Sequence, residues 1–159
     1  MTKHFDDINV NIEKESDDFI KVIAEPFERG HGVTIGNALR RSLLTSIPGS
    51  AITSLHIDGV SHEFTNIKGV KEDISDIILN LKDVRFKAVS DGPELTSITL
   101  DGPCDFKASD IAKTLAEFEV LNPESHIATI TDKVTLSIDL RISRGKGYTP
   151  AENNKRKDD

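Results

Sequence analysis

One short segment near the N-terminal end, residues 25–49, constrains what this chain can form more than any other part of the sequence. A strand is expected to end at Pro26, because proline lacks the N–H that a strand ladder needs. A glycine-rich corner follows over residues 30–36, where glycines can supply a positive φ. Thr34 is a suitable N-cap for a helix over residues 35–46, and the proline–glycine pair after it ends the helix.

The predicted helix carries an apolar stripe on one side. Its members recur at four-residue steps, as one face of a helix requires: Ile35, Leu39, Leu43 and Ile47, with Ala38 beside them. The helix is too apolar to lie bare in water and too short to form a core alone. It therefore needs a partner, which favours an assembly protein over a self-contained enzyme.

Two adjacent arginines give the same helix a second, mixed face. Arg40 and Arg41 point about 100° apart, because successive helical residues rotate by that angle. Arg41 shares its side with Asn37, Leu44 and Thr45, away from the apolar stripe. Mixed faces with arginine suit protein interfaces, where the guanidinium makes bidentate contacts. A solvated arginine remains an equally good interpretation of this feature alone.

The rest of the chain reads as an α+β protein, mostly antiparallel sheet. Alternating apolar residues predict strands, and turn-forming dipeptides join some of them. The strand over residues 8–12 is expected to pair with 20–24, and the strand over 51–57 is expected to pair with 60–64 through Asp58-Gly59. A β meander through 98–100 and strands at 126–130 and 134–142 are expected as well. The best helix lies at 70–81, where apolar residues occupy i, i+4, i+7, i+8 and i+11. Its early acids, Glu72 among them, suit the helix dipole.

Composition excludes several classes of function. The chain carries 20 Lys+Arg against 27 Asp+Glu, a net charge of −7, which disfavours broad nucleic-acid binding. No apolar run approaches the roughly 20 residues of a membrane helix, and no export signal opens the chain. The single cysteine, Cys104, fits a reducing cytosol. A cytoplasmic protein without membrane contact is expected.

Three other groupings carry weaker functional interpretations. The corner at 30–36 is one residue too long for a dinucleotide fingerprint, and no parallel βαβ unit follows it. His56, His62 and Glu63 lie close in sequence but lack a fourth ligand at standard spacing, so no metal site is expected. The run 144–148 is basic and carries the single tyrosine. It is either a strand-exit loop or a nucleic-acid contact, and an unrelated nucleic-acid-binding β module is the alternative hypothesis.

The chain closely resembles the N-terminal domain of the bacterial RNA polymerase alpha subunit. The resemblance rests on the segment 25–49 and on runs that follow in the family's order and spacing: 57–60, 62–64, 69–74, 78–82, 122–123 and 144–150. It implies a first lobe that forms a homodimer through paired helices and a second lobe inserted into the first. The dimer is the platform for the beta and then the beta-prime subunit of DNA-directed RNA polymerase.

The resemblance also implies roles for individual residues. The stripe Ile35, Leu39, Leu43 and Ile47 would form the dimer interface. Arg41 corresponds to the family arginine most closely tied to beta-subunit binding, with Leu44 and Asn37 in the same patch, and Lys82 would also lie toward beta. The family's alpha subunit contributes no catalytic residue and holds no cofactor or metal.

One departure from the family concerns the end of the chain. Family members continue past the segment equivalent to 148–150, complete the first lobe, and lead to a DNA-binding domain. This chain is therefore expected to be a fragment: part of the dimerisation lobe (1–48), a whole insert lobe (49–150) and a mobile polar tail (151–159). The apolar stripe would then lose part of its cover, which predicts a rearranged oligomer or poor order before Gly49. Contacts with beta-prime and DNA would lie outside these residues.

Overall fold

The computed structural model describes residues 8–14, 16, 19–90 and 92–155, and these form an α+β fold of antiparallel sheets and helices. The chain divides into two compact units between Thr45 and Ser46, close to the predicted lobe boundary after residue 48. Most of residues 15–18, between the first two predicted strands, and the end of the predicted polar tail lie outside the described residues.

The first unit contains a hairpin and a helix. Strands β1 (Asn9–Lys14) and β2 (Ile20–Glu25) pair antiparallel as predicted, with Ile12 opposite Val22. Helix α1 spans His31–Ser46 and so begins before Thr34, which is not its N-cap. Gly30, with φ of 93°, makes the corner alone, and Gly32 lies inside the helix rather than at a positive φ. The turn before α1 closes with a bond from the N–H of His31 to the carbonyl of Glu28 (3.0 Å).

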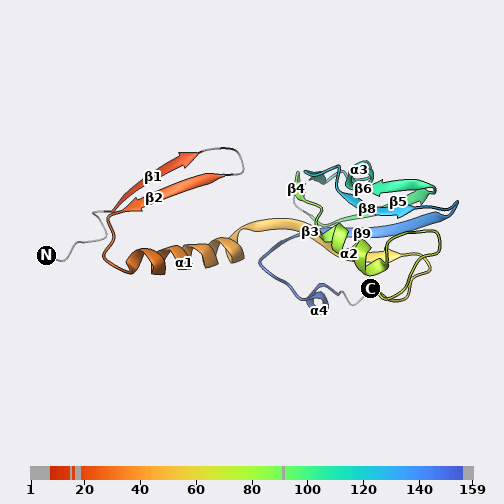
Figure 1. The fold of residues 1–159 in the computed structure, drawn as a ribbon, viewed down its shortest axis with the longest axis horizontal. Helices are drawn as coiled ribbons and strands as arrows, with labels where there is room; N and C mark the ends of the chain where they lie inside the picture. The colour runs from red at the N-terminus through yellow and green to blue at the C-terminus, as the bar shows by residue number, and fades with distance from the viewer. Residues whose placement is uncertain (1–7, 15, 17–18, 91, 156–159) are drawn as a thin grey trace. The chain divides into compact units, whose positions relative to one another are not determined.

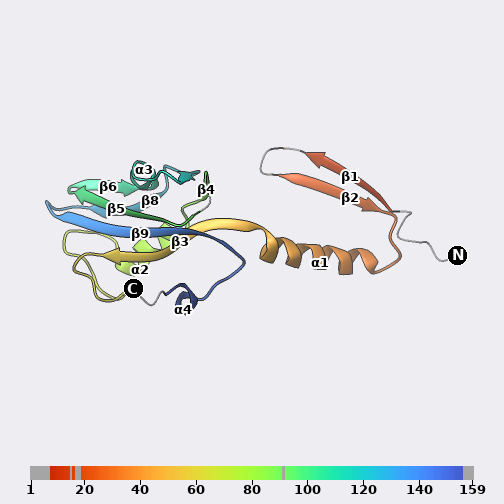
Figure 2. The ribbon, with the colours of Figure 1, turned by 180° about the vertical axis from the view of Figure 1, so that it is seen from behind.

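The second unit is built on a five-stranded antiparallel sheet. Its strands are β3 (Pro48–Ile57), β4 (Phe86–Ala88), β5 (Glu94–Asp101), β7 (Phe118–Val120) and β9 (Thr135–Lys146). They lie in the order β5-β9-β3-β4-β7. In Figure 1 and, from behind, in Figure 2, the long strand β9 runs beside β3 along most of its length.

A second, two-stranded sheet and short helices complete this unit. The sheet pairs β6 (Cys104–Lys107) with β8 (His126–Ile130). The helices are α2 (Ile74–Lys82), α3 (Ala108–Ala112) and α4 (Ala151–Asn154). Helix α4 occupies the start of the segment predicted to be a polar tail. Helix α2 begins at Ile74 rather than at residue 70, because the preceding residues pair with β8 instead.

The hydrophobic core lies between α2 and the sheets. Every second residue of β9 is buried from Leu136 to Ile142, as the alternation predicted. Helix α2 buries Ile74, Ile77 and Leu81 and contacts both β3 and β8. Burying each such side chain stabilises the fold by about 1.5–3 kcal/mol before conformational entropy is counted.

Two further sequence predictions, both about strand pairing, are wrong, and one segment predicted as a loop is largely strand. Residues 60–64 form no strand: the turn at Asp58 exists, but β3 pairs with β9 and β4 instead. The expected meander is absent because β5 pairs with β9 rather than with a neighbour in sequence. The predicted basic loop at 144–148 is largely strand, since β9 extends to Lys146.

A close backbone contact at Gly102 gives a test of this fold. The N–H of Gly102 bonds to the carbonyl of Val134 (2.9 Å), and a Cβ added at Gly102 would overlap the carbonyl oxygen of Asp132. We expect Gly102→Ala to lower the free energy of unfolding by about 1–3 kcal/mol in urea denaturation, because the backbone must shift. Gly145→Ala is the control, since nothing lies within 4 Å of the added atom there. Equal stability of the two variants would contradict the packing described.

Candidate protein-interaction surfaces

The apolar stripe of α1 lies in the open. Leu39 and Leu43 are 58% and 59% exposed, and Ile35 is partly buried. Ile47, predicted as the last member of the stripe, follows the end of α1 and is 60% exposed. Every residue of α1 is described, and none is buried. A helix with this much bare aliphatic surface is typical of an interface whose partner is another polypeptide.

The second face of α1 is exposed as well. Arg41, Asn37 and Leu44 all lie on it, and Leu44 is exposed like the stripe leucines. The carbonyl of Arg41 accepts a bond from the Thr45 hydroxyl (2.9 Å), which lies within the helix. In the part of the chain that the structure describes, no acidic side chain pairs with the Arg41 guanidinium.

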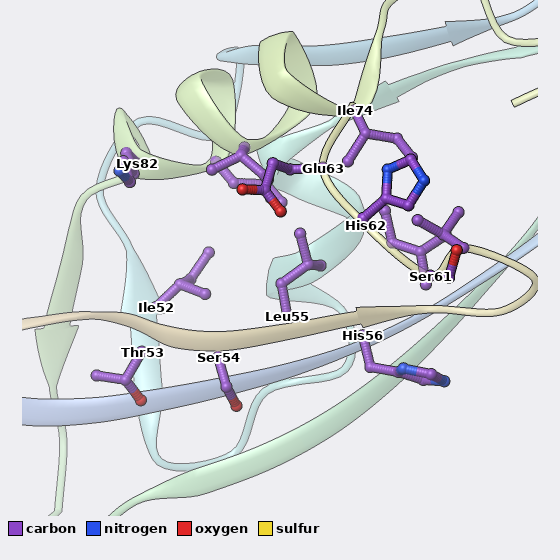
Figure 3. A pocket seen from close by; sticks show the side chains of 14 residues that line it. Ile52, Thr53, Ser54, Leu55, His56, Ser61, His62, Glu63, Ile74 and Lys82 are labelled. Atoms are coloured by element: carbon purple, nitrogen blue, oxygen red, sulfur yellow. The ribbon is translucent and has the colours of Figure 1, made fainter. Parts of the chain in front are cut away.

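Lys82, the fourth residue predicted to bind beta, belongs to the second unit. It is exposed at the end of α2 and borders a hollow of about 400 Å³ between β3 and α2. Figure 3 shows Ile52 and Leu55 extending from β3 toward α2, with Lys82 at one end of the hollow and His62 toward the other. The floor is aliphatic and the rim is polar, a combination common at binding sites.

His56, His62 and Glu63 all border this hollow, but each histidine has a partner of its own. His56 Nε2 lies 3.4 Å from an Asp58 carboxylate oxygen, and His62 Nδ1 lies 3.0 Å from the Thr65 hydroxyl. Among the described residues, no three histidine, cysteine or acidic side chains are grouped so that they could hold a metal ion.

Glu72 ties the segment before α2 to strand β8. Its carboxylate accepts bonds from the Thr129 N–H (2.6 Å) and hydroxyl (3.2 Å), and its other contact is His126 Nε2 (3.0 Å). Asn80 holds the other end of α2, donating from Nδ2 to the carbonyl of Ile127 (2.9 Å). Together these bonds fix the position of α2, and hence of Lys82, on β8.

Sequence reasoning missed this role of Glu72. The sequence pattern placed Glu72 in the first turn of a helix, whereas Glu72 precedes α2 and faces β8. No local signal could have found the contact, because Glu72 and Thr129 lie 57 residues apart in sequence.

Comparison with known proteins decides between the interpretations left open by the sequence. Residues 55–159 match the family model of the RNA polymerase Rpb3/RpoA insert domain. The chain is 57% identical over 135 residues to the DNA-directed RNA polymerase subunit alpha of Chloroherpeton thalassium, an alignment that covers 85% of this chain and 41% of that protein. The chain belongs to the RNA polymerase alpha subunit family.

Other family members give the same result. Identity to the alpha subunit of Prosthecochloris aestuarii is 52% over 148 residues, covering 93% of this chain and 45% of that protein. Identity to the alpha subunit of Salinibacter ruber is 51% over 150 residues, covering 94% and 46%. The chain thus spans less than half the length of these relatives.

The position of the basic run 144–148 bears on the nucleic-acid-binding hypothesis. Arg144 and Lys146 are residues of β9, opposite Ser50 and Pro48, so the basic run is not the free loop that the nucleic-acid hypothesis assumed. No helix in the described ranges is long and apolar enough to cross a membrane.

The Glu72 contact predicts how the stability of this alpha-family chain depends on pH. Burial alone would raise the pKa of Glu72, but the bonds from the Thr129 backbone and from His126 hold that pKa below its usual value. A carboxylate of lowered pKa stabilises the fold above the pKa of the unfolded chain, 4.5, and that contribution is lost as the pH falls through the folded value. We expect the free energy of unfolding to fall steeply with acid in this range.

The matched variant is Glu72→Gln. At neutral pH it should cost about 1–3 kcal/mol in urea denaturation, because it weakens charge-assisted bonds, and it should flatten the acid dependence. Glu124→Gln serves as the control, since the Glu124 side chain is 83% exposed. An acid dependence that is the same in Glu72→Gln and in the unaltered chain would show that Glu72 does not hold α2 in this way.

Proposed function

We propose that this chain is the N-terminal part of a bacterial RNA polymerase alpha subunit, a non-catalytic scaffold in the cytoplasm. It dimerises and provides the platform on which the beta and beta-prime subunits assemble for transcription. The observation that carries this proposal is the exposed stripe of α1 in a chain of this family. The nucleotidyl-transfer chemistry belongs to the other subunits, and this chain needs no cofactor.

The dimer contact uses the stripe Ile35, Leu39, Leu43 and Ile47. Ile35, Leu39 and Leu43 lie on one side of α1, and Ile47 follows the end of the helix; the two leucines and Ile47 are exposed. Covering each of them stabilises an assembly by about 1.5–3 kcal/mol before the entropy of association is counted. The partner surface is supplied by a second alpha subunit.

The beta contact uses the other face of α1. Arg41 supplies a guanidinium for a carboxylate or a carbonyl of beta, Leu44 supplies apolar area, and Asn37 supplies an amide on the same side. Arginine is enriched among the residues that dominate binding energy, because it combines bidentate bonds with stacking area. Lys82 adds a beta contact from the second unit.

Arg41→Ala in the full-length alpha subunit tests this assignment. We expect binding of purified beta to weaken by about 2–4 kcal/mol in an equilibrium titration, the cost of truncating an interface arginine. Arg40→Ala is the matched control, because it removes the same charge from the neighbouring direction on α1. Unchanged affinity in Arg41→Ala would remove Arg41 from the interface, and equal losses in both variants would mean that charge rather than position matters.

A further inference from the structure

Arg141 lies on the face of the five-stranded sheet that is turned away from the core. The residues on either side of it in β9 are buried in the core, and side chains alternate along a strand, so Arg141 lies on the opposite face. Its cross-strand partners are Leu95 on β5 and Ser54 on β3, and directly paired residues share a face with Cβ atoms about 4.5–5.5 Å apart. Figure 3 shows Ser54 extending from β3 on the side opposite to Leu55 and the hollow. Arg141 therefore lies between Leu95 and Ser54 on this outer face of the sheet.

Most of the Arg141 side chain is covered, yet its charge is unpaired. The residue is only 9% exposed. Within the described residues, its guanidinium makes no ion pair and no hydrogen bond. The acid two residues before it on the same face, Asp139, accepts a bond from the Ser97 hydroxyl instead (2.5 Å). Arginine is rarely buried without a partner, because an unpaired charge then loses hydration without compensation. The arrangement therefore lacks a counter-ion.

The guanidinium nitrogens of Arg141 are nevertheless within reach of a ligand. Across the described ranges, no side-chain nitrogen or oxygen is both sealed from solvent and without a hydrogen-bond partner. Since the Arg141 nitrogens have no partner, they must touch solvent. The neighbours on both sides leave the approach open, because Leu95 is 78% exposed and Ser54 is exposed as well. The stem is held by packing while its charged end faces outward, so little side-chain entropy is lost when a ligand binds.

A carboxylate on a polypeptide is the ligand that fits this place. A guanidinium binds carboxylate and phosphate groups through two parallel bonds. A nucleic-acid backbone would bring many phosphates, and the exposed Asp139 and Asp101 on the same face would repel them. A small free carboxylate would leave Leu95 bare. A peptide segment that carries an apolar side chain close to its acid covers both groups, as the centre of a protein interface does.

We propose that Leu95, Arg141 and Ser54 form a docking site for an acidic peptide segment of another protein. An Asp or Glu carboxylate of that segment pairs with the Arg141 guanidinium and accepts a bond from the Ser54 hydroxyl, and an aliphatic side chain beside it packs on Leu95. The site goes beyond the proposed scaffold function, because it uses neither face of α1 nor the end of α2.

The test is a titration of the full-length alpha subunit, labelled at its leucine methyl groups, with the peptide acetyl-Leu-Ser-Glu-Ser-Leu-amide. Residues two apart share a face of an extended segment, so either peptide direction places one leucine beside the acid on the side of Leu95. We expect saturable shifts of the Leu95 methyl signals in NMR spectra. The same peptide with Gln in place of Glu should bind at least about tenfold more weakly, because it loses the charge-assisted bonds. Arg141→Gln should weaken binding of the Glu peptide to a similar extent.

Arg144→Gln is the matched control, because it removes the same charge three residues along β9, where the alternation places the residue on the other face. It should leave peptide binding unchanged. The proposal is overturned if the Leu95 signals do not move, if the Glu and Gln peptides bind equally, or if Arg144→Gln loses as much affinity as Arg141→Gln. Sodium acetate that saturates the same signals at the peptide's own concentration would also overturn it, since a bare carboxylate would then suffice. The Gln peptide examines the pairing on the unaltered protein, so the result does not depend on whether Arg141→Gln folds.

Discussion

Aliphatic burial around strand β9 is the interaction on which the rest of the structure depends. Among the described residues, the buried hydrophobic side chains all lie between Ile57 and Ile142. Strand β9 supplies one continuous row of them and pairs with β3 on one side and β5 on the other. Because this core closes within the second unit, that unit can present rigid surfaces. Within the first unit, no residue of α1 is buried.

This division separates two kinds of surface. On α1, exposure of the stripe and of the Arg41 face means that the helix gains most of its stability from whatever covers it, since short helices are marginal in water. On α2, the position of the surface is set from within, because Glu72 and Asn80 bind β8 at both ends of the helix. We propose that assembly completes the surface on α1, whereas the fold of the second unit already sets the position of α2.

Sequence reasoning succeeded where the pattern was local. The periodicity of α2 and of β9 and the hairpin of the first unit were confirmed, since each depends on residues a few positions apart. It failed where distant segments meet. The turn at Asp58 could not reveal that β3 pairs with β9, and Glu72 carries no signal of what lies beside it across the fold. Which residues reach an interface depends on how such distant segments pack together.

Hydrogen–deuterium exchange of the α1 amides tests the central claim, that another polypeptide covers the stripe, most directly. The account predicts rapid exchange along residues 31–46 in this chain as a monomer, and exchange at least about a hundredfold slower in the full-length dimeric subunit. Strand β9 provides the internal standard, because it should be protected in both. Protection of α1 equal to that of β9 in the lone monomer would contradict the account.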